Sequence, residues 1–174
     1  MHKPIETFSR RMRVESGFNP FAALDELYQQ TIGHKLFSCS KLNIQKGGIG
    51  TAVRVYTSDE ANYPMSELKE IVPNRWTQIV IEDQETFFAN SVDGFADVFP
   101  DHALIEALGL GSVVNVPVIV EGALLGTVNI LNETGYFDDS RLAVLGEFEA
   151  AAQLVFLLES KEAYSTVSDD IGVI

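Results

Sequence analysis

The stretch from residue 109 to residue 132 constrains the fold more than any other part of the chain. Its sequence, GLGSVVNVPVIVEGALLGTVNILN, has two runs of β-branched and aliphatic residues, 112–120 and 124–131, on either side of Glu121-Gly122. A glycine at this place can adopt the positive φ that a tight turn between antiparallel strands requires. We therefore predict a long antiparallel hairpin.

Polar side chains interrupt both predicted strands. Asn115, Thr127 and Asn129 stand among Val, Ile and Leu, whereas a strand buried on both faces reads as a nearly continuous apolar run. At least one face of the hairpin therefore carries polar groups that need partners. Asn115 and Asn129 point to opposite faces if the hairpin closes with two loop residues, and share one face if a strand contains a bulged residue.

Composition and charge limit the class of protein and the class of partner. A chain of 174 residues with 46% hydrophobic content is sufficient for one domain with a core. Beyond residue 13 it carries 8 basic against 24 acidic side chains, within a total net charge of -13. Because affinity for nucleic acids comes largely from Lys and Arg that displace counterions, we predict no nucleic-acid binding.

Cys39 is the only cysteine in the chain. A single cysteine excludes an intramolecular disulfide and the Cys/His spacings of metal sites, so we expect no metal and no cofactor. No basic neighbour is present to stabilise a thiolate, which favours a buried packing role for Cys39 over a nucleophilic one. The sequence also lacks the pattern of a signal peptide or a membrane span, so we expect a cytoplasmic protein that does not bind membranes.

Around a predicted domain over residues 20–163, the chain has two short extensions. Residues 1–19 combine scattered basic side chains with few apolar anchors, which predicts a flexible basic leader. The alternative is a basic arm that contacts an acidic neighbour. Residues 164–174 are predicted to form a flexible tail.

Hydrophobic periodicity predicts the remaining elements. Pro20 suits the first turn of a helix that Asn19 can cap. Further helices are expected over 65–72, 75–82, 102–108 (with Asp101 as its cap) and 141–163, and strands over 35–44, 50–57 and 84–90.

The last predicted helix is apolar well beyond the single stripe that a surface helix needs. We therefore expect a second buried contact, most simply with another copy of the chain, and hence a homodimer. The residues predicted at that dimer interface are Leu24, Tyr28, Val144, Ala151, Leu154 and Leu158.

Residues 109–152 resemble the second half of a GAF domain. Members of that family typically show a strand ending in Val-Pro, a turn with Gly, a Gly-Val/Thr-aliphatic strand, and a Phe-Asp entry to a long apolar helix. The corresponding segments here are Asn115-Val116-Pro117, Glu121-Gly122, Leu125-Gly126-Thr127-Val128-Asn129-Ile130 and Phe137-Asp138-Asp139. The resemblance extends back to Phe21. It implies an α+β fold, a GAF/PAS-like central antiparallel sheet with the N- and C-terminal helices on one face and short helices and loops on the other.

Three activities found among GAF domains match this sequence poorly. Those that bind cyclic nucleotides share an Asn-Lys, Phe and Asp-Glu signature; Asn132 and Phe137 match it, but Glu133 replaces the Lys, and Arg141-Leu142 replaces the acidic pair. Those that attach a bilin use a cysteine placed elsewhere than Cys39.

The third activity is that of free methionine-(R)-sulfoxide reductase, a stand-alone GAF protein of similar size. Its chemistry needs two thiols, and carboxylates at positions that here hold Val113, Asn129 and Leu131. We keep it as a remote alternative and predict that the protein is not an enzyme.

In the family, the ligand lies between the sheet and the small helices and loops. The resemblance places eight residues there: Trp76, Phe88, Asn90, Phe95, Phe99, His102, Asn115 and Asn129. Aromatic residues at this density more often belong to the core or a lid over it than to a pocket wall, and His102 is more typical of a helix-face or capping residue than of a ligand contact. Asn side chains offer both a donor and an acceptor, and no Arg or Lys lies between residues 75 and 141, so we expect a ligand that is not strongly anionic.

The resulting prediction is a non-catalytic sensory or regulatory module that binds a small molecule and signals through dimer or partner contacts. The alternative is a dimeric protein-interaction module without a ligand.

Overall fold

The computed structural model describes residues 3–14, 17–45, 47 and 50–169. A six-stranded antiparallel sheet in the order β3-β2-β1-β6-β5-β4 forms its centre. The strands are β1 (Leu36–Ile44), β2 (Gly50–Thr57), β3 (Lys69–Glu70), β4 (Phe87–Ala89), β5 (Ser112–Val120) and β6 (Ala123–Asn132). The helices are α1 (Pro4–Val14), α2 (Pro20–Thr31), α3 (Arg75–Thr77), α4 (His102–Ala107), α5 (Asp139–Ala143) and α6 (Glu149–Asp169).

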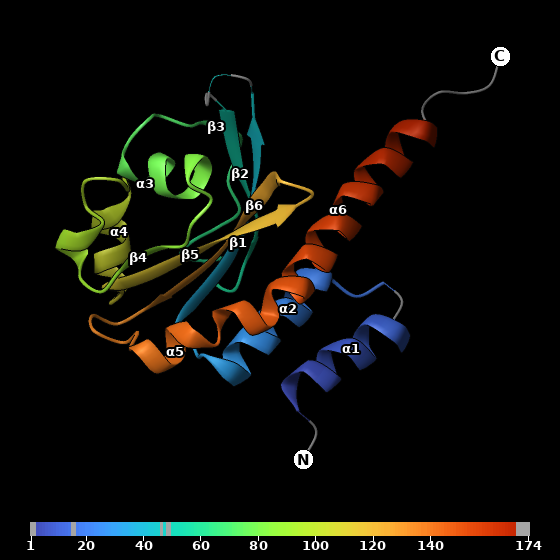
Figure 1. The fold of residues 1–174 in the computed structure, drawn as a ribbon, viewed down its shortest axis with the longest axis horizontal. Coiled ribbons are helices and arrows are strands. Elements are labelled where there is room, and N and C mark those ends of the chain that lie inside the picture. Colours follow the sequence, from blue (N-terminus) through green and yellow to red (C-terminus); the bar gives the residue numbers. More distant parts are fainter. Residues whose placement is uncertain (1–2, 15–16, 46, 48–49, 170–174) are drawn as a thin grey trace.

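The sheet has a different cover on each face. Helices α2 and α6 lie against one face, and α3 and α4 with their loops lie against the other (Figure 1). This arrangement confirms the predicted α+β fold. No helix within the described ranges is long and apolar enough to cross a membrane.

The predicted hairpin is present as β5 and β6. Its turn places Glu121 at φ 52° and Gly122 at φ 77°, the two positive values that suit a two-residue hairpin loop. The register then shifts between Val118 and Ile119, and Asn115 lies directly opposite Asn129. A bulge therefore brings the two amides to the same face of the sheet, the second of the two arrangements open from sequence.

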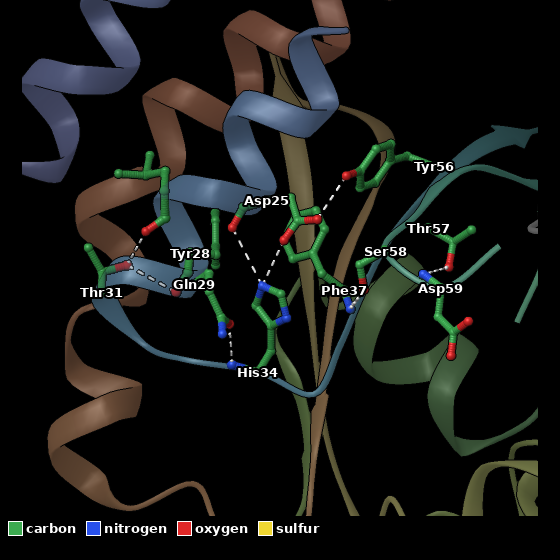
Figure 2. A network of polar contacts seen from close by, with 11 residues as sticks. Asp25, Tyr28, Gln29, Thr31, His34, Phe37, Tyr56, Thr57, Ser58 and Asp59 are labelled. Atoms are coloured by element: carbon green, nitrogen blue, oxygen red, sulfur yellow. Dashed lines mark hydrogen bonds and ion pairs between the residues drawn. The ribbon is translucent and has the colours of Figure 1, made fainter. Parts of the chain in front are cut away.

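Polar contacts at Asp25 hold α2 against the sheet. The helix begins as predicted, with the Asn19 side chain accepting a hydrogen bond from Phe21 N at 2.9 Å. One turn later, Asp25 accepts a hydrogen bond from the Tyr56 hydroxyl of β2 at 2.8 Å, and its other carboxylate oxygen lies 2.8 Å from His34 Nε2 (Figure 2). The carboxylate therefore joins the helix, the strand β2 and the loop before β1.

Part of the predicted dimer interface is buried in the core under α2 and α6. Leu24 and Tyr28 are fully buried within the protomer, in one cluster with Phe156 of α6, so they have no surface to offer a second copy. Ala151 is also buried there, Val144 and Leu158 are half-buried, and Leu154 is exposed. Cys39 is fully buried in the same cluster, in agreement with its predicted packing role.

The N-terminal segment contains a helix that the sequence did not lead us to expect. Residues 4–14 form α1, which packs on α2 and buries Phe8 in the core. Arg11 Nη1 lies 2.5 Å from Glu26 Oε2 of α2. This ion pair is the kind of contact expected for the alternative interpretation of the segment, a basic arm that contacts an acidic neighbour. At the other end, α6 continues to Asp169, into the predicted tail, of which residues 170–174 lie outside the described residues.

The helix predicted over 65–72 was wrong, because pairing with a strand satisfies this segment's backbone. Lys69 and Glu70 form β3 on the edge of β2. The Ser66 hydroxyl accepts a hydrogen bond from Arg54 N at 2.9 Å. These contacts take the place of the i to i−4 bonds of a helix, and tertiary context overrides local propensity.

Three other predicted elements exist in altered form. The helix over 75–82 is α3 followed by a π-helical turn, Gln78–Glu82, and Asn74 caps it. The strand over 84–90 is reduced to β4. The helix over 141–163 is interrupted, because α5 and a 3-10 turn, Leu145–Phe148, precede α6.

Candidate functional site

A cavity of about 320 Å³ lies between the sheet and the short helices on the α3 and α4 side. Its floor is formed by side chains of β1, β2, β5 and β6, and its walls by the segments around residues 63, 69–77 and 98–105. This volume is at the small end of the range for small-molecule sites.

A chain of hydrogen bonds crosses the floor of the cavity. Trp76 Nε1 donates to Asn115 Oδ1 at 2.9 Å, and Asn115 Nδ2 donates to Asn129 Oδ1 at 2.7 Å. Asn129 Nδ2 then lies 3.3 Å from the hydroxyl oxygens of both Ser38 and Ser40. These five side chains, which we call the amide ladder, fix each other's orientation while leaving the serine hydroxyl protons free to donate to a ligand.

Thr127 adds an unpartnered polar group beside the ladder. It lies two residues from Asn129 on β6 and opposite Ser40 on β1, so it shares the cavity face. Its hydroxyl oxygen is buried and has no hydrogen-bond partner among the described residues, although Thr127 lines the cavity. Leaving such a group unpaired costs about 1–3 kcal/mol, which a polar atom placed in the cavity could offset.

The other end of the cavity carries charged side chains. The Arg54 guanidinium carbon lies 3.6 Å from the centre of the Tyr63 ring, in a cation–π contact. The Tyr63 hydroxyl donates to Asp101 Oδ2 at 3.0 Å, and burial, aided by the Asp101 charge, raises the pKa of Tyr63. The Asp101 side chain was expected to cap α4, but it makes no capping bond and accepts from Tyr63 instead.

The structure brings together four of the eight residues predicted to contact a ligand. Trp76, Phe99, Asn115 and Asn129 all line the cavity, and the remaining four lie outside its lining.

Each of the remaining four has a structural environment of its own. Phe88 is exposed on β4. Asn90 bonds both the backbone N–H and the carbonyl of Phe137. Phe95 is fully buried in the small core beneath α4, and His102 Nδ1 lies 2.8 Å from the Phe99 carbonyl.

Sequence reasoning missed several residues of the lining. Ser38 and Ser40 alternate with Phe37 and Cys39, and this period of two was the signal that one face of β1 is polar. Arg54 gave no such signal, because only the pairing of β1 with β2 places it opposite Ser40.

Solved structures share this fold over most of the chain. The GAF domain of a two-component sensor histidine kinase from Bacillus halodurans superposes with a TM-score of 0.64 at 15% identity, covering 86% of this chain and 98% of that one. A methyl-accepting chemotaxis protein, residues 122 to 287, gives 0.64 at 16% identity, covering 90% and 97%. The GAF domain from a phosphoenolpyruvate-protein phosphotransferase of Coxiella burnetii gives 0.56 at 16% identity, covering 97% and 98%.

A comparison with curated proteins found no match. GAF domains serve as sensory and regulatory modules in sensor kinases and chemoreceptors, and they are generally not catalytic. The GAF domain family model matches residues 27–155, from α2 into α6. With this match over most of its length, the chain belongs to the GAF domain family.

Proposed function

We propose that this protein is a non-catalytic sensory module that binds a small molecule in the cavity over the amide ladder. The single observation that carries the proposal is the buried polar floor of that cavity. Asn115 is 4% exposed and Thr127 is 1% exposed, and both line the cavity beside Ser38, Ser40 and Asn129. Buried polar groups of this kind are normally satisfied, so a cavity that leaves one unpaired favours a polar occupant.

Asn115 is the best position at which to test binding. Its amide joins Trp76 to Asn129, so Asn115→Leu removes the centre of the ladder while keeping a similar side-chain volume. We expect native mass spectrometry of the protein purified from its own cells to detect a retained small molecule, and Asn115→Leu to lose it. A thermal shift of the wild-type protein with that compound should likewise be absent in the variant.

A matched control keeps a loss of binding separate from a loss of folding. Asn43→Leu changes an exposed amide on β1, outside the cavity lining, and should retain the ligand and the thermal shift. A wild-type protein with no retained compound and no thermal shift against a broad metabolite panel would contradict the proposal.

The exposed side of α6 supports a second component of the proposal, signalling through a dimer or partner. Leu154 and Leu157 are 42% and 41% exposed, and α6 extends beyond the rest of the domain (Figure 1). Apolar helical surface of this kind is typical of interfaces. It is also the observation that favours the alternative function, a ligand-free interaction module.

Light scattering tests the role of this surface. If α6 forms a dimer, Leu154→Asp with Leu157→Asp should halve the molar mass, because a buried interface does not tolerate unpaired charges. Met65→Asp with Leu68→Asp adds the same two charges at exposed apolar residues outside α6, and should leave the mass unchanged. A wild-type monomer at micromolar concentration would contradict the dimer.

A further inference from the structure

We propose that the ligand carries one carboxylate, which Arg54 and Lys69 bind at one end of the cavity, and an uncharged hydrogen-bonding body that lies over the amide ladder. This inference rests on the proposed function, and it names the chemical class of the compound. The expectation from sequence, a ligand that is not strongly anionic, rested on the absence of Arg and Lys between residues 75 and 141 and did not consider Arg54 and Lys69.

The ion pairs of the domain single out these two cations. Between residues 17 and 160 the structure describes six Lys and Arg side chains, and four of them pair with carboxylates. The pairs are Lys35–Glu133, Lys41–Glu159, Arg75–Asp97 and Arg141–Asp138. Within that described range, the two that have no ion pair are Arg54 and Lys69, and both line the cavity.

The absence of an ion pair at Arg54 and Lys69 among the described residues is notable because the chain has a large excess of acidic side chains. With 25 acidic and 12 basic side chains, carboxylates are plentiful as partners for every cation. Two cations that have no ion pair in the described part of the chain, on a surface with so many carboxylates, and that both line one cavity, offer charged hydrogen-bond donors to a ligand. A negatively charged ligand group would be drawn to these donors.

Strand pairing places the two cations on the same face as the polar floor. Residues opposite each other in an antiparallel pair project from one face, as do residues two apart on a strand. Lys69 lies opposite Ala52, which is two residues from Arg54. Arg54 lies opposite Ser40, and Ser40 lies opposite Thr127. The cations therefore lie on the same face of the sheet as the unpartnered threonine hydroxyl.

The Arg54 guanidinium is held in an orientation suited to a carboxylate. Its central carbon lies 3.6 Å from the centre of the Tyr63 ring, and Nη1 donates to the Pro64 carbonyl at 2.6 Å. Most of its five N–H donors remain for a ligand. A planar guanidinium binds a carboxylate through two parallel hydrogen bonds, which gives it geometric selectivity as well as charge attraction.

The acidic residues of the lining limit the ligand to a single negative charge. Asp101 lines the cavity with one oxygen bonded to Tyr63, and Glu70 lines it beside Lys69. Two carboxylates beside two cations leave little net positive charge for a dianion such as a phosphate monoester. The apolar wall of Trp76, Phe99, Ile105 and Leu131 suits an aromatic or branched body.

Paired compounds that differ only in charge test this assignment. Calorimetry would compare N-acetylphenylalanine with its primary amide and phenyllactate with its primary amide, and phenyl phosphate would serve as the dianion. We expect each acid to bind more tightly than its amide and than phenyl phosphate. In Arg54→Gln the affinity for the acids should fall roughly tenfold or more, as for loss of a charged hydrogen bond, and the affinity for the amides should change little.

Two further variants complete the design. Lys69→Gln, on the exposed edge strand, should also lower the affinity for the acids. It provides an independent test if Arg54→Gln fails to fold. Lys35→Gln removes a cation that is paired with Glu133, away from the cavity, and should leave binding unchanged.

The outcomes separate this inference from the proposed function. A retained or bound neutral compound that Asn115→Leu abolishes and Arg54→Gln leaves unchanged would overturn the carboxylate while the sensory role stands. Preference for the amides or for phenyl phosphate would overturn it in the same way. No retained compound and no binding by any probe would overturn both.

Discussion

Replacing Tyr28 with Phe should stabilise the protein, although it removes a polar group from a fully buried residue. The Tyr28 hydroxyl has no hydrogen-bond partner among the described residues. Its ring packs between Phe37 and Phe148, with centroids 5.5 and 5.6 Å away, so the surroundings are apolar. Tyr28→Phe keeps the ring contacts and removes only the unpaired oxygen.

The magnitude follows from the desolvation of that hydroxyl. A buried polar group without a partner costs about 1–3 kcal/mol, and the packing contacts of the lost oxygen offset part of the gain. We expect the free energy of unfolding to rise by about 1 kcal/mol. For a domain of this size, this corresponds to an increase in Tm of roughly 2–4 °C.

Alkaline pH should widen the difference between the two proteins. Burial raises the pKa of Tyr28 in the folded state, with smaller contributions from the charges of Cys39 and Glu149. Above about pH 10 the unfolded chain therefore releases this proton while the folded chain keeps it, and wild-type stability falls by about 1.4 kcal/mol per pH unit from this group. Tyr28→Phe lacks that loss.

Urea denaturation followed by the fluorescence of Trp76, the only tryptophan in the chain, measures both effects. Tyr56→Phe is the matched control, because it makes the same chemical change to a hydroxyl that donates to Asp25. It should lower the unfolding free energy by roughly 1 kcal/mol. A Tyr28→Phe protein that is less stable than wild type by that amount at pH 8 would refute the reasoning, since the hydroxyl would then have a partner.

Three more predictions concern the frame of the site. Gly126→Ala should destabilise the fold by about 1–3 kcal/mol or more in chemical denaturation, because its Cβ would lie 2.1 Å from the Ser40 carbonyl oxygen; stability within 0.5 kcal/mol of wild type would contradict this. Asn90→Ala should reduce the free energy of unfolding by roughly 1–2 kcal/mol, since it removes both hydrogen bonds to the Phe137 backbone, and an unchanged Tm would count against it. Burial raises the pKa of Tyr63, so Tyr63→Phe should show a shallower loss of stability above about pH 10, and identical alkaline slopes would exclude this role.

The elements that were predicted correctly are those whose signals are local. The hairpin turn and the Asn19 cap each depend on a few adjacent residues. The structures of segment 65–72 and of α1 were not predicted, because both depend on contacts with residues far away in the sequence. A pairing with β2 fixes the first, and burial of Phe8 against distant side chains stabilises the second.

In the cavity too, the lining residues that were predicted were those recognisable from their sequence neighbours, and the residues missed were those placed there by strand pairing. Asn115 and Asn129 were recognisable in the sequence as polar residues among aliphatic neighbours. The bulge that places them on the same face of the sheet could not be predicted from their spacing along the chain. Arg54 and Lys69 reach the cavity only through the register of β1, β2 and β3. No pattern within either strand alone distinguishes these cations from ordinary surface charges.

Because of the bulge in the hairpin, the register of β6 determines which side chains lie on each face of the sheet. Had β6 paired regularly from its turn, Asn115 would oppose Val128, and the amide of Asn129 would turn toward Phe156 and the hydrocarbon under α6. A slip by one residue would thus damage the interior and the cavity together. Chains that have closed this hairpin in the wrong register should accordingly lose their core packing as well as the cavity, so that misaligned molecules do not persist in a folded form.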